Sequence, residues 1–173
     1  MKHNPRLFKS LLLALLVVLT ALAQHAFFPA AGASHTAWLL LALTTAIAMR
    51  EREPRAAVFG LLAGALWDIA SPLPDGALAL FFFVFACAAS LLSHFVFRQS
   101  LLTAAVLCAG GSVALGILLH ILNVAGKDPS AFLSIVFASF LPCFLLTAVS
   151  LPLYYYLVRT IDRKWLPAPG NRK

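Results

Sequence analysis

Six continuous runs of apolar residues constrain the fold of this chain more than any other feature of its sequence. They cover residues 7–28, 35–49, 56–70, 77–97, 101–122 and 131–158. Hydrophobic residues fill 62% of the 173 positions and charged residues only 11%, which is more apolar surface than one soluble core could bury. A bilayer must therefore be the solvent for much of the chain. The runs are continuous rather than alternating, so they favour helices over a β-barrel.

These runs predict an all-α fold, a polytopic bundle of six transmembrane helices. It forms a single integral membrane domain over residues 1–173, with a basic tail at 159–173. A spanning helix needs about 20 residues, so the second and third runs are short. Pro152 is expected to kink or end the sixth helix.

Lysine and arginine residues fall almost entirely on one side of this bundle. When the two chain ends are grouped with the second and fourth loops, twelve of the thirteen basic residues share that side, and only Lys127 lies on the other. The positive-inside rule makes the crowded side cytoplasmic, so both termini are expected in the cytoplasm. The net charge of +7 then reflects topology and the anionic lipid bilayer. It does not indicate nucleic-acid binding, because the charges are spread over four short segments.

The first run leaves a question of processing open. Lys2, Arg6 and Lys9 precede it, and residues 21–23 resemble a signal-peptidase site, so cleavage after Ala23 would leave five helices. However, apolar character resumes at 26–28 and gives the run a spanning length. We therefore expect the first helix to be retained.

Asp68 is the only acidic residue inside a predicted helix, and small residues precede it at every fourth position: Ala56, Gly60 and Gly64. Such stripes let two membrane helices approach closely. A carboxylate in the membrane needs a partner, and the C-terminal end of its own helix disfavours negative charge. We expect a partner helix to dock in the glycine groove and bind Asp68. Pairing with His120 within the chain, and ordinary internal packing of the stripe, are the alternatives.

A similar stripe in residues 101–122 consists of Ala104, Cys108, Ser112 and Gly116, and it ends at His120. Its spacing again suits close contact between helices.

Several polar residues are expected near the outer leaflet, because they lie at the outer ends of predicted helices: Gln24, His25, His35, His120 and Asn123. If these helices are neighbours, the residues line a polar vestibule. It is either a metal or ligand site, for which histidine and carboxylate are suitable, or a set of interfacial side chains wetted by headgroups and solvent. No two of these histidines are four residues apart, which favours the second interpretation.

The sequence lacks the motifs of the common enzyme classes. It contains no nucleophile elbow, phosphate-binding glycine loop, zinc-protease motif or pair of helical carboxylates. Cys87, Cys108 and Cys143 lie in apolar runs without metal-ligand spacing. We therefore expect no catalytic residue, no cofactor and no metal, and the chain is not expected to be an enzyme.

Residues 60–80, GLLAGALWDIASPLPDGALAL, resemble the signature of the rod shape-determining protein MreD family. In that family a Gly-x-x-x-Gly helix leads to an aspartate, a short turn with serine and proline, and a glycine that opens the next helix. Gly60, Gly64, Asp68 and Gly76 match these positions. The resemblance implies partner-binding residues at these four positions, and the small-residue stripe adds Ala56 to them.

The resemblance implies a non-enzymatic scaffold in the bacterial inner (cytoplasmic) membrane that maintains rod shape and sidewall peptidoglycan synthesis. The implied partners are an MreC-like bitopic membrane protein and, through it, the actin-like MreB filament, with the RodA glycosyltransferase and its transpeptidase partner alongside. The family is similar in fold to the substrate-binding components of energy-coupling-factor vitamin transporters. A substrate-binding subunit of a membrane transporter is the alternative function, and it would need a pocket lined by several polar groups.

Overall fold

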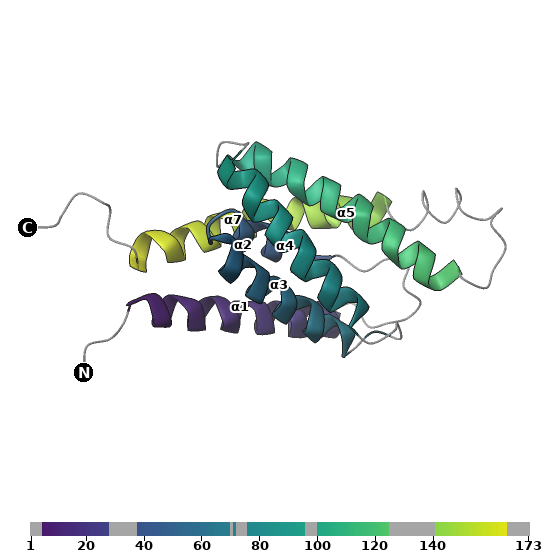
Figure 1. Ribbon diagram of the computed structural model, residues 1–173, viewed down its shortest axis with the longest axis horizontal. Coiled ribbons are helices and arrows are strands. Elements are labelled where there is room, and N and C mark those ends of the chain that lie inside the picture. The colour runs from purple at the N-terminus through teal and green to yellow at the C-terminus, as the bar shows by residue number, and fades with distance from the viewer. Residues whose placement is uncertain are drawn as a thin grey trace, which may run out of the picture.

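The computed structural model describes residues 5–27, 38–69, 71, 76–95, 100–124 and 141–165. Within these residues the chain is all-α and forms six helices (Figure 1): α1 (Pro5–Phe27), α2 (Leu39–Ala48), α3 (Glu53–Asp68), α4 (Ala77–Phe95), α5 (Leu101–Val124) and α7 (Leu141–Trp165). The expected all-α bundle is confirmed at this level.

Most helix bounds differ from the predicted ones by a few residues, and two of the differences have identifiable reasons. α3 already begins at Glu53, because Pro54 occupies its first turn, where the missing N–H costs no hydrogen bond. α7 runs through Pro152 and continues to Trp165. Of the two expectations for Pro152, that it ends the helix is wrong, and that it kinks the helix stays a prediction. The first residues of the segment predicted as a tail, up to Trp165, are helical. Residues 131–140 of the sixth predicted helix lie outside the described part.

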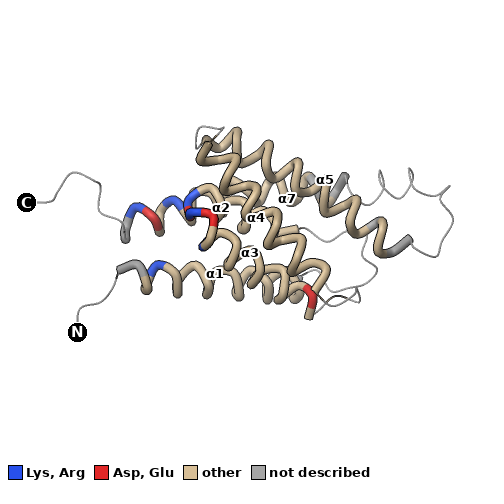
Figure 2. Tube along the Cα trace, viewed as in Figure 1, with Lys and Arg blue, Asp and Glu red and all other residues tan. Residues whose placement is uncertain are grey.

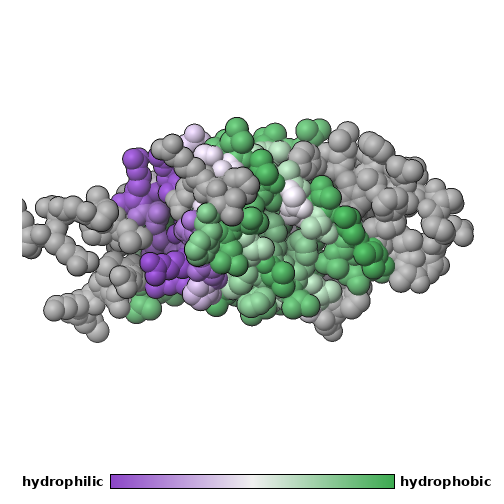
Figure 3. Space-filling model, turned by 45° about the horizontal axis from the view of Figure 1, so that its top comes forward, coloured by the Kyte–Doolittle hydropathy of each residue, from purple (hydrophilic) through white to green (hydrophobic). Residues whose placement is uncertain are grey.

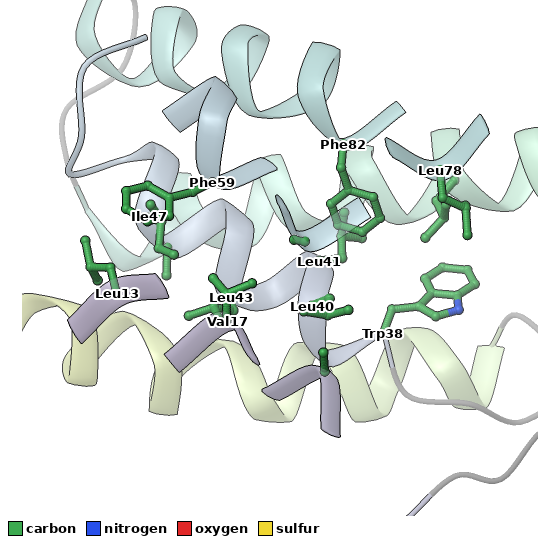
Figure 4. Packing of buried hydrophobic residues seen from close by; sticks show 14 of the residues in the cluster. Leu13, Val17, Trp38, Leu40, Leu41, Leu43, Ile47, Phe59, Leu78 and Phe82 are labelled. Atoms are coloured by element: carbon green, nitrogen blue, oxygen red, sulfur yellow. The ribbon is translucent and has the colours of Figure 1, made fainter. Parts of the chain in front are cut away.

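α2 occupies the centre of the bundle. All its residues from Leu40 to Ala48 are buried, and α2 contacts each of the other five described helices. Figure 4 shows apolar side chains from α1, α3 and α4 packed around it, namely Leu13, Val17, Phe59, Leu78 and Phe82. A helix that is apolar on all sides belongs in an interior. This short helix is therefore the core around which the longer helices pack.

Three described helices are long and apolar enough to cross a membrane: α1 over Leu7–Ala26, α4 over Ala77–Phe95 and α5 over Leu101–Leu119. Their outward side chains are exposed and apolar, for example Leu11, Val84 and Val113. Figure 3 shows a broad apolar surface next to a hydrophilic end. The chain therefore has the character of a multi-pass membrane protein. Of the six predicted spanning helices, the structure thus confirms three as long and apolar enough to cross a membrane.

Candidate functional site

The small-residue stripe of α3 faces α4 of the same chain. A Cβ atom added at Gly60 would collide with the carbonyl oxygen of Phe82 and would lie 2.6 Å from the Cβ of Ala86. A Cβ atom added at Gly64 would lie 2.5 Å from the Cα of Ala79. These separations are too short for any side chain, so glycine is what lets the two backbones approach so closely.

Ala56 extends the same interface toward the start of α3. It is buried together with Ala48 of α2 and with Ala86 and Ala89 of α4. The glycine groove is thus filled by the chain's own α4, and the expectation of an open groove for a partner helix is wrong. Ordinary internal packing, the alternative left open by the sequence, describes the stripe.

Asp68 caps the N-terminus of α4. Its Oδ1 accepts a hydrogen bond from the backbone N–H of Leu78 at 3.1 Å, and its Oδ2 accepts one from the N–H of Ala79 at 2.9 Å. The N–H groups of a first helical turn have no partner inside the helix. Gly76 precedes this turn with a φ of +86°, in the left-handed region, and has no side chain to cap it. Asp68 therefore provides, from α3, the hydrogen-bond acceptors that a residue immediately before a helix usually provides.

This contact revises the electrostatics expected for Asp68. The carboxylate lies at the unfavourable C-terminal end of α3, but it also lies at the positive N-terminal end of α4. Its partner is thus the backbone of the same chain. The alternative pairing with His120 stays a prediction, because the side chain of His120 is outside the described part.

A second polar site joins α1, α3 and α7 at the other end of the bundle. Lys9 Nζ lies 2.5 Å from Glu51 Oε1 and 2.6 Å from Asp162 Oδ1. Arg55 lies 3.6 Å from the second carboxylate oxygen of Glu51. The side chains of Lys9 and Glu51 are only 6% and 7% exposed, so this is a buried ion pair. We call Lys9, Glu51, Arg55 and Asp162 the ion cluster.

The composition of the ion cluster suits its burial. Buried charges are costly unless each one faces a counter-ion, and here two cations face two carboxylates. No local sequence pattern predicts this cluster, because Lys9 and Asp162 are 153 positions apart in the sequence. Among the described residues, lysine and arginine gather at this end of the bundle (Figure 2). That distribution is what the positive-inside rule predicts for a cytoplasmic end.

Polar side chains from α1 and α7 satisfy the N-terminal end of α2. Gln24 Oε1 accepts a hydrogen bond from the N–H of Leu40, and Thr147 Oγ1 accepts one from the N–H of Trp38, each at 3.1 Å. α2 has ten residues and is about 15 Å long, half of the roughly 30 Å hydrocarbon layer. Its N-terminal end therefore lies inside the bundle, where an unpaired N–H group would be costly.

Residues of α4 satisfy the C-terminal side of α2. The carbonyl oxygen of Glu51 accepts a hydrogen bond from the Ser90 hydroxyl at 2.9 Å, and His94 Nε2 lies 3.2 Å from the same oxygen. The turn after α2 is thus anchored twice, by its backbone to α4 and by the Glu51 carboxylate to the ion cluster.

The predicted polar vestibule is described only in part. Gln24 is engaged in capping α2. His25 Nε2 is buried, with no hydrogen-bond partner in the described part. His35 and the side chains of His120 and Asn123 lie outside it, so their convergence stays a prediction. Among the described residues, no three His, Cys, Asp or Glu side chains are grouped to hold a metal ion.

The α5 stripe also faces the interior, because all its described members are buried: Ala104, Cys108, Ser112 and Gly116. Ala104 and Cys108 pack with Leu151 and Tyr155 of α7. Like the α3 stripe, it serves packing within the chain. Cys87, Cys108 and Cys143 are free thiols.

No protein-family model, no curated protein and no solved structure matches this chain. The functional interpretation therefore rests on its own residues and on the resemblance carried by residues 60–80.

Proposed function

We propose that this chain is a non-enzymatic membrane scaffold of the bacterial cell-elongation machinery, with both termini in the cytoplasm. The observation that carries the proposal is the match of Gly60, Gly64, Asp68 and Gly76 to the MreD-family signature. All four residues serve one helical hairpin: the glycines set the distance between α3 and α4, Asp68 caps α4, and Gly76 opens it. All four residues of the signature hold this one hairpin in shape. We take this as support for a role in which a partner protein recognises the hairpin.

The proposed partner surface is the outer face of the α3–α4 hairpin rather than the glycine groove. On α4 this face carries exposed apolar side chains that point away from α3, Leu80 and Val84. The single spanning helix of an MreC-like bitopic protein can pack on such a face through van der Waals contact. Through this contact the chain would connect the MreB filament with RodA and its transpeptidase partner.

Co-purification tests this proposal. The tagged chain, extracted from bacterial membranes in a mild detergent, is expected to retain the MreC-like partner. Leu80→Trp should reduce that retention, because the larger side chain disturbs the outer face of the hairpin. Leu19→Trp is the matched control, since Leu19 is also apolar and 53% exposed but lies on α1.

Two results would contradict the proposal. Absence of the partner from the wild-type preparation would argue against the scaffold function. Equal retention by Leu80→Trp and Leu19→Trp, normalised to membrane abundance, would argue against the hairpin as the docking surface.

A substrate-binding subunit of a membrane transporter is the second candidate, and one feature favours it. Transporters often place the N-terminal end of a short helix at their substrate site, and the N-terminal end of α2 lies inside the bundle in this way. The buried Nε2 of His25 has no hydrogen-bond partner in the described part. His25→Ala separates the candidates: the scaffold predicts unchanged rod shape, whereas the transporter predicts lost function at normal abundance.

A further inference from the structure

We propose that the charged end of the bundle binds the phosphate of an anionic phospholipid, at a site formed by Arg50 and Arg159 beside Tyr155. This inference requires only that the chain is embedded in a bilayer. It does not depend on the proposed scaffold function.

Arg50 follows α2, and its side chain lies against α7. Its Nη2 donates a hydrogen bond to Tyr155 Oη at 3.2 Å, and its guanidinium carbon lies 5.3 Å from the centre of the Tyr155 ring. Arg50 is half-buried, and its Nε is buried with no hydrogen-bond partner in the described part. Both contacts are to a neutral side chain. They leave the positive charge of Arg50 without an anion among the described residues.

The acidic residues of the ion cluster do not supply this anion. Glu51 is bound by Lys9 and Arg55, and Asp162 is bound by Lys9. No described carboxylate lies within ion-pair distance of Arg50. A partly buried charge is unfavourable unless an opposite charge or a dipole offsets it. The C-terminal end of α2 provides only about half a unit of negative charge. An external anion would complete the balance.

A second arginine lies on the same side of α7. Arg159 follows Tyr155 by four residues, so the two side chains share one face of the helix. Arg159 is also half-buried. The guanidinium group of arginine presents planar sets of N–H donors that bind phosphate well, and this spacing places a second such group on the face of α7 that Arg50 contacts.

The position of the site favours a lipid over a soluble anion. Tyr155 packs with the apolar residues Met49 and Leu151, and Figure 3 shows that the hydrophilic end borders directly on the apolar surface. Basic residues beside spanning helices also attract anionic lipids.

Lipid binding to the purified full-length chain tests this proposal. The chain in uncharged detergent is titrated with phosphatidylglycerol or phosphatidylcholine, and bound lipid is measured by native mass spectrometry. Wild type should prefer phosphatidylglycerol. Arg50→Gln should bind it about tenfold more weakly, because a charge-assisted contact is worth roughly one decade in affinity. Arg159→Gln should also weaken binding, by several-fold.

Arg52→Gln is the matched control, because Arg52 is exposed at the same end and the variant loses the same charge. Equal loss in Arg50→Gln and Arg52→Gln would overturn the proposal, as would a wild type without preference for phosphatidylglycerol. Competition by soluble glycerol phosphate would overturn the assignment to a lipid. Thermal unfolding in the same detergent checks that each variant is folded. If Arg50→Gln fails to fold, Arg159→Gln takes its place, and a loss of binding equal to that of Arg52→Gln would again overturn the proposal.

Discussion

Replacing Asp68 with alanine removes both acceptors that the first turn of α4 uses. The N–H groups of Leu78 and Ala79 then lose their partner in a part-buried position. In the scaffold account the variant loses stability first, and any loss of the partner follows from that. This expectation differs from the one based on an open groove, in which the variant would fold normally and lose only the partner.

The magnitude follows from two contributions. A helix-capping side chain is worth typically about 1 kcal/mol, with a range of about 0.5–2 kcal/mol. A carboxylate near a helix N-terminus adds about 0.3–1 kcal/mol. We therefore expect Asp68→Ala to lower the free energy of unfolding by about 2 kcal/mol. Asp68→Asn should cost about 1 kcal/mol, because the amide keeps one acceptor and loses the charge.

Reversible unfolding in mixed micelles, followed by circular dichroism during titration with a denaturing detergent, measures these differences. Glu53→Ala is the control: Glu53 also lies in a first helical turn, in α3, and its removal should cost less than about 1 kcal/mol. An Asp68→Ala variant as stable as the wild type would refute the capping role and the hairpin that depends on it.

Three further predictions use the same chain. Gly64→Ala should cost about 1–3 kcal/mol by forcing α3 and α4 apart. By contrast Gly110→Ala, where an added Cβ atom meets open space, should be neutral or slightly stabilising in the same titration. Lys9→Met should cost about 3 kcal/mol, since it leaves the part-buried Asp162 without its counter-ion and the buried Glu51 with only the more distant Arg55. Arg55→Met, at a side chain 50% exposed, should cost less than about 1 kcal/mol, and similar losses would argue against the buried pair. Reporter fusions at positions 2 and 173 should read cytoplasmic and those at 31, 75 and 127 external, and an external C-terminus would contradict the orientation.

The helices follow from the sequence because each apolar run is continuous rather than alternating with polar residues. The role of α2 does not, since a ten-residue apolar segment is compatible with a short span, a buried helix or a re-entrant piece. The burial of α2 by its five neighbouring helices identifies it as an interior helix. That burial depends on contacts between residues that are far apart in the sequence. Pro152 shows a related limit: tertiary packing keeps α7 helical through a residue that usually ends a helix.

The candidate site was predictable in its residues but not in its contacts. Spacing alone identifies Gly60, Gly64 and Asp68 as one face of a helix, yet it cannot say whether the helix opposite belongs to this chain. The dipole of α3 alone disfavours the Asp68 carboxylate, whereas the N-terminus of α4 favours it and reverses the sign of the effect. The positive-inside rule already accounts for Lys9 in the sequence. Its second role, in the ion cluster, could therefore not be predicted from the sequence.

Cell shape after depletion of the protein tests the scaffold proposal most directly. In a rod-shaped host that depends on its own copy of this chain, depletion is expected to turn rods into spheres by stopping sidewall synthesis. Expression of the wild-type chain should restore the ratio of cell length to width. Cells that remain rods through many generations without the protein would contradict the account.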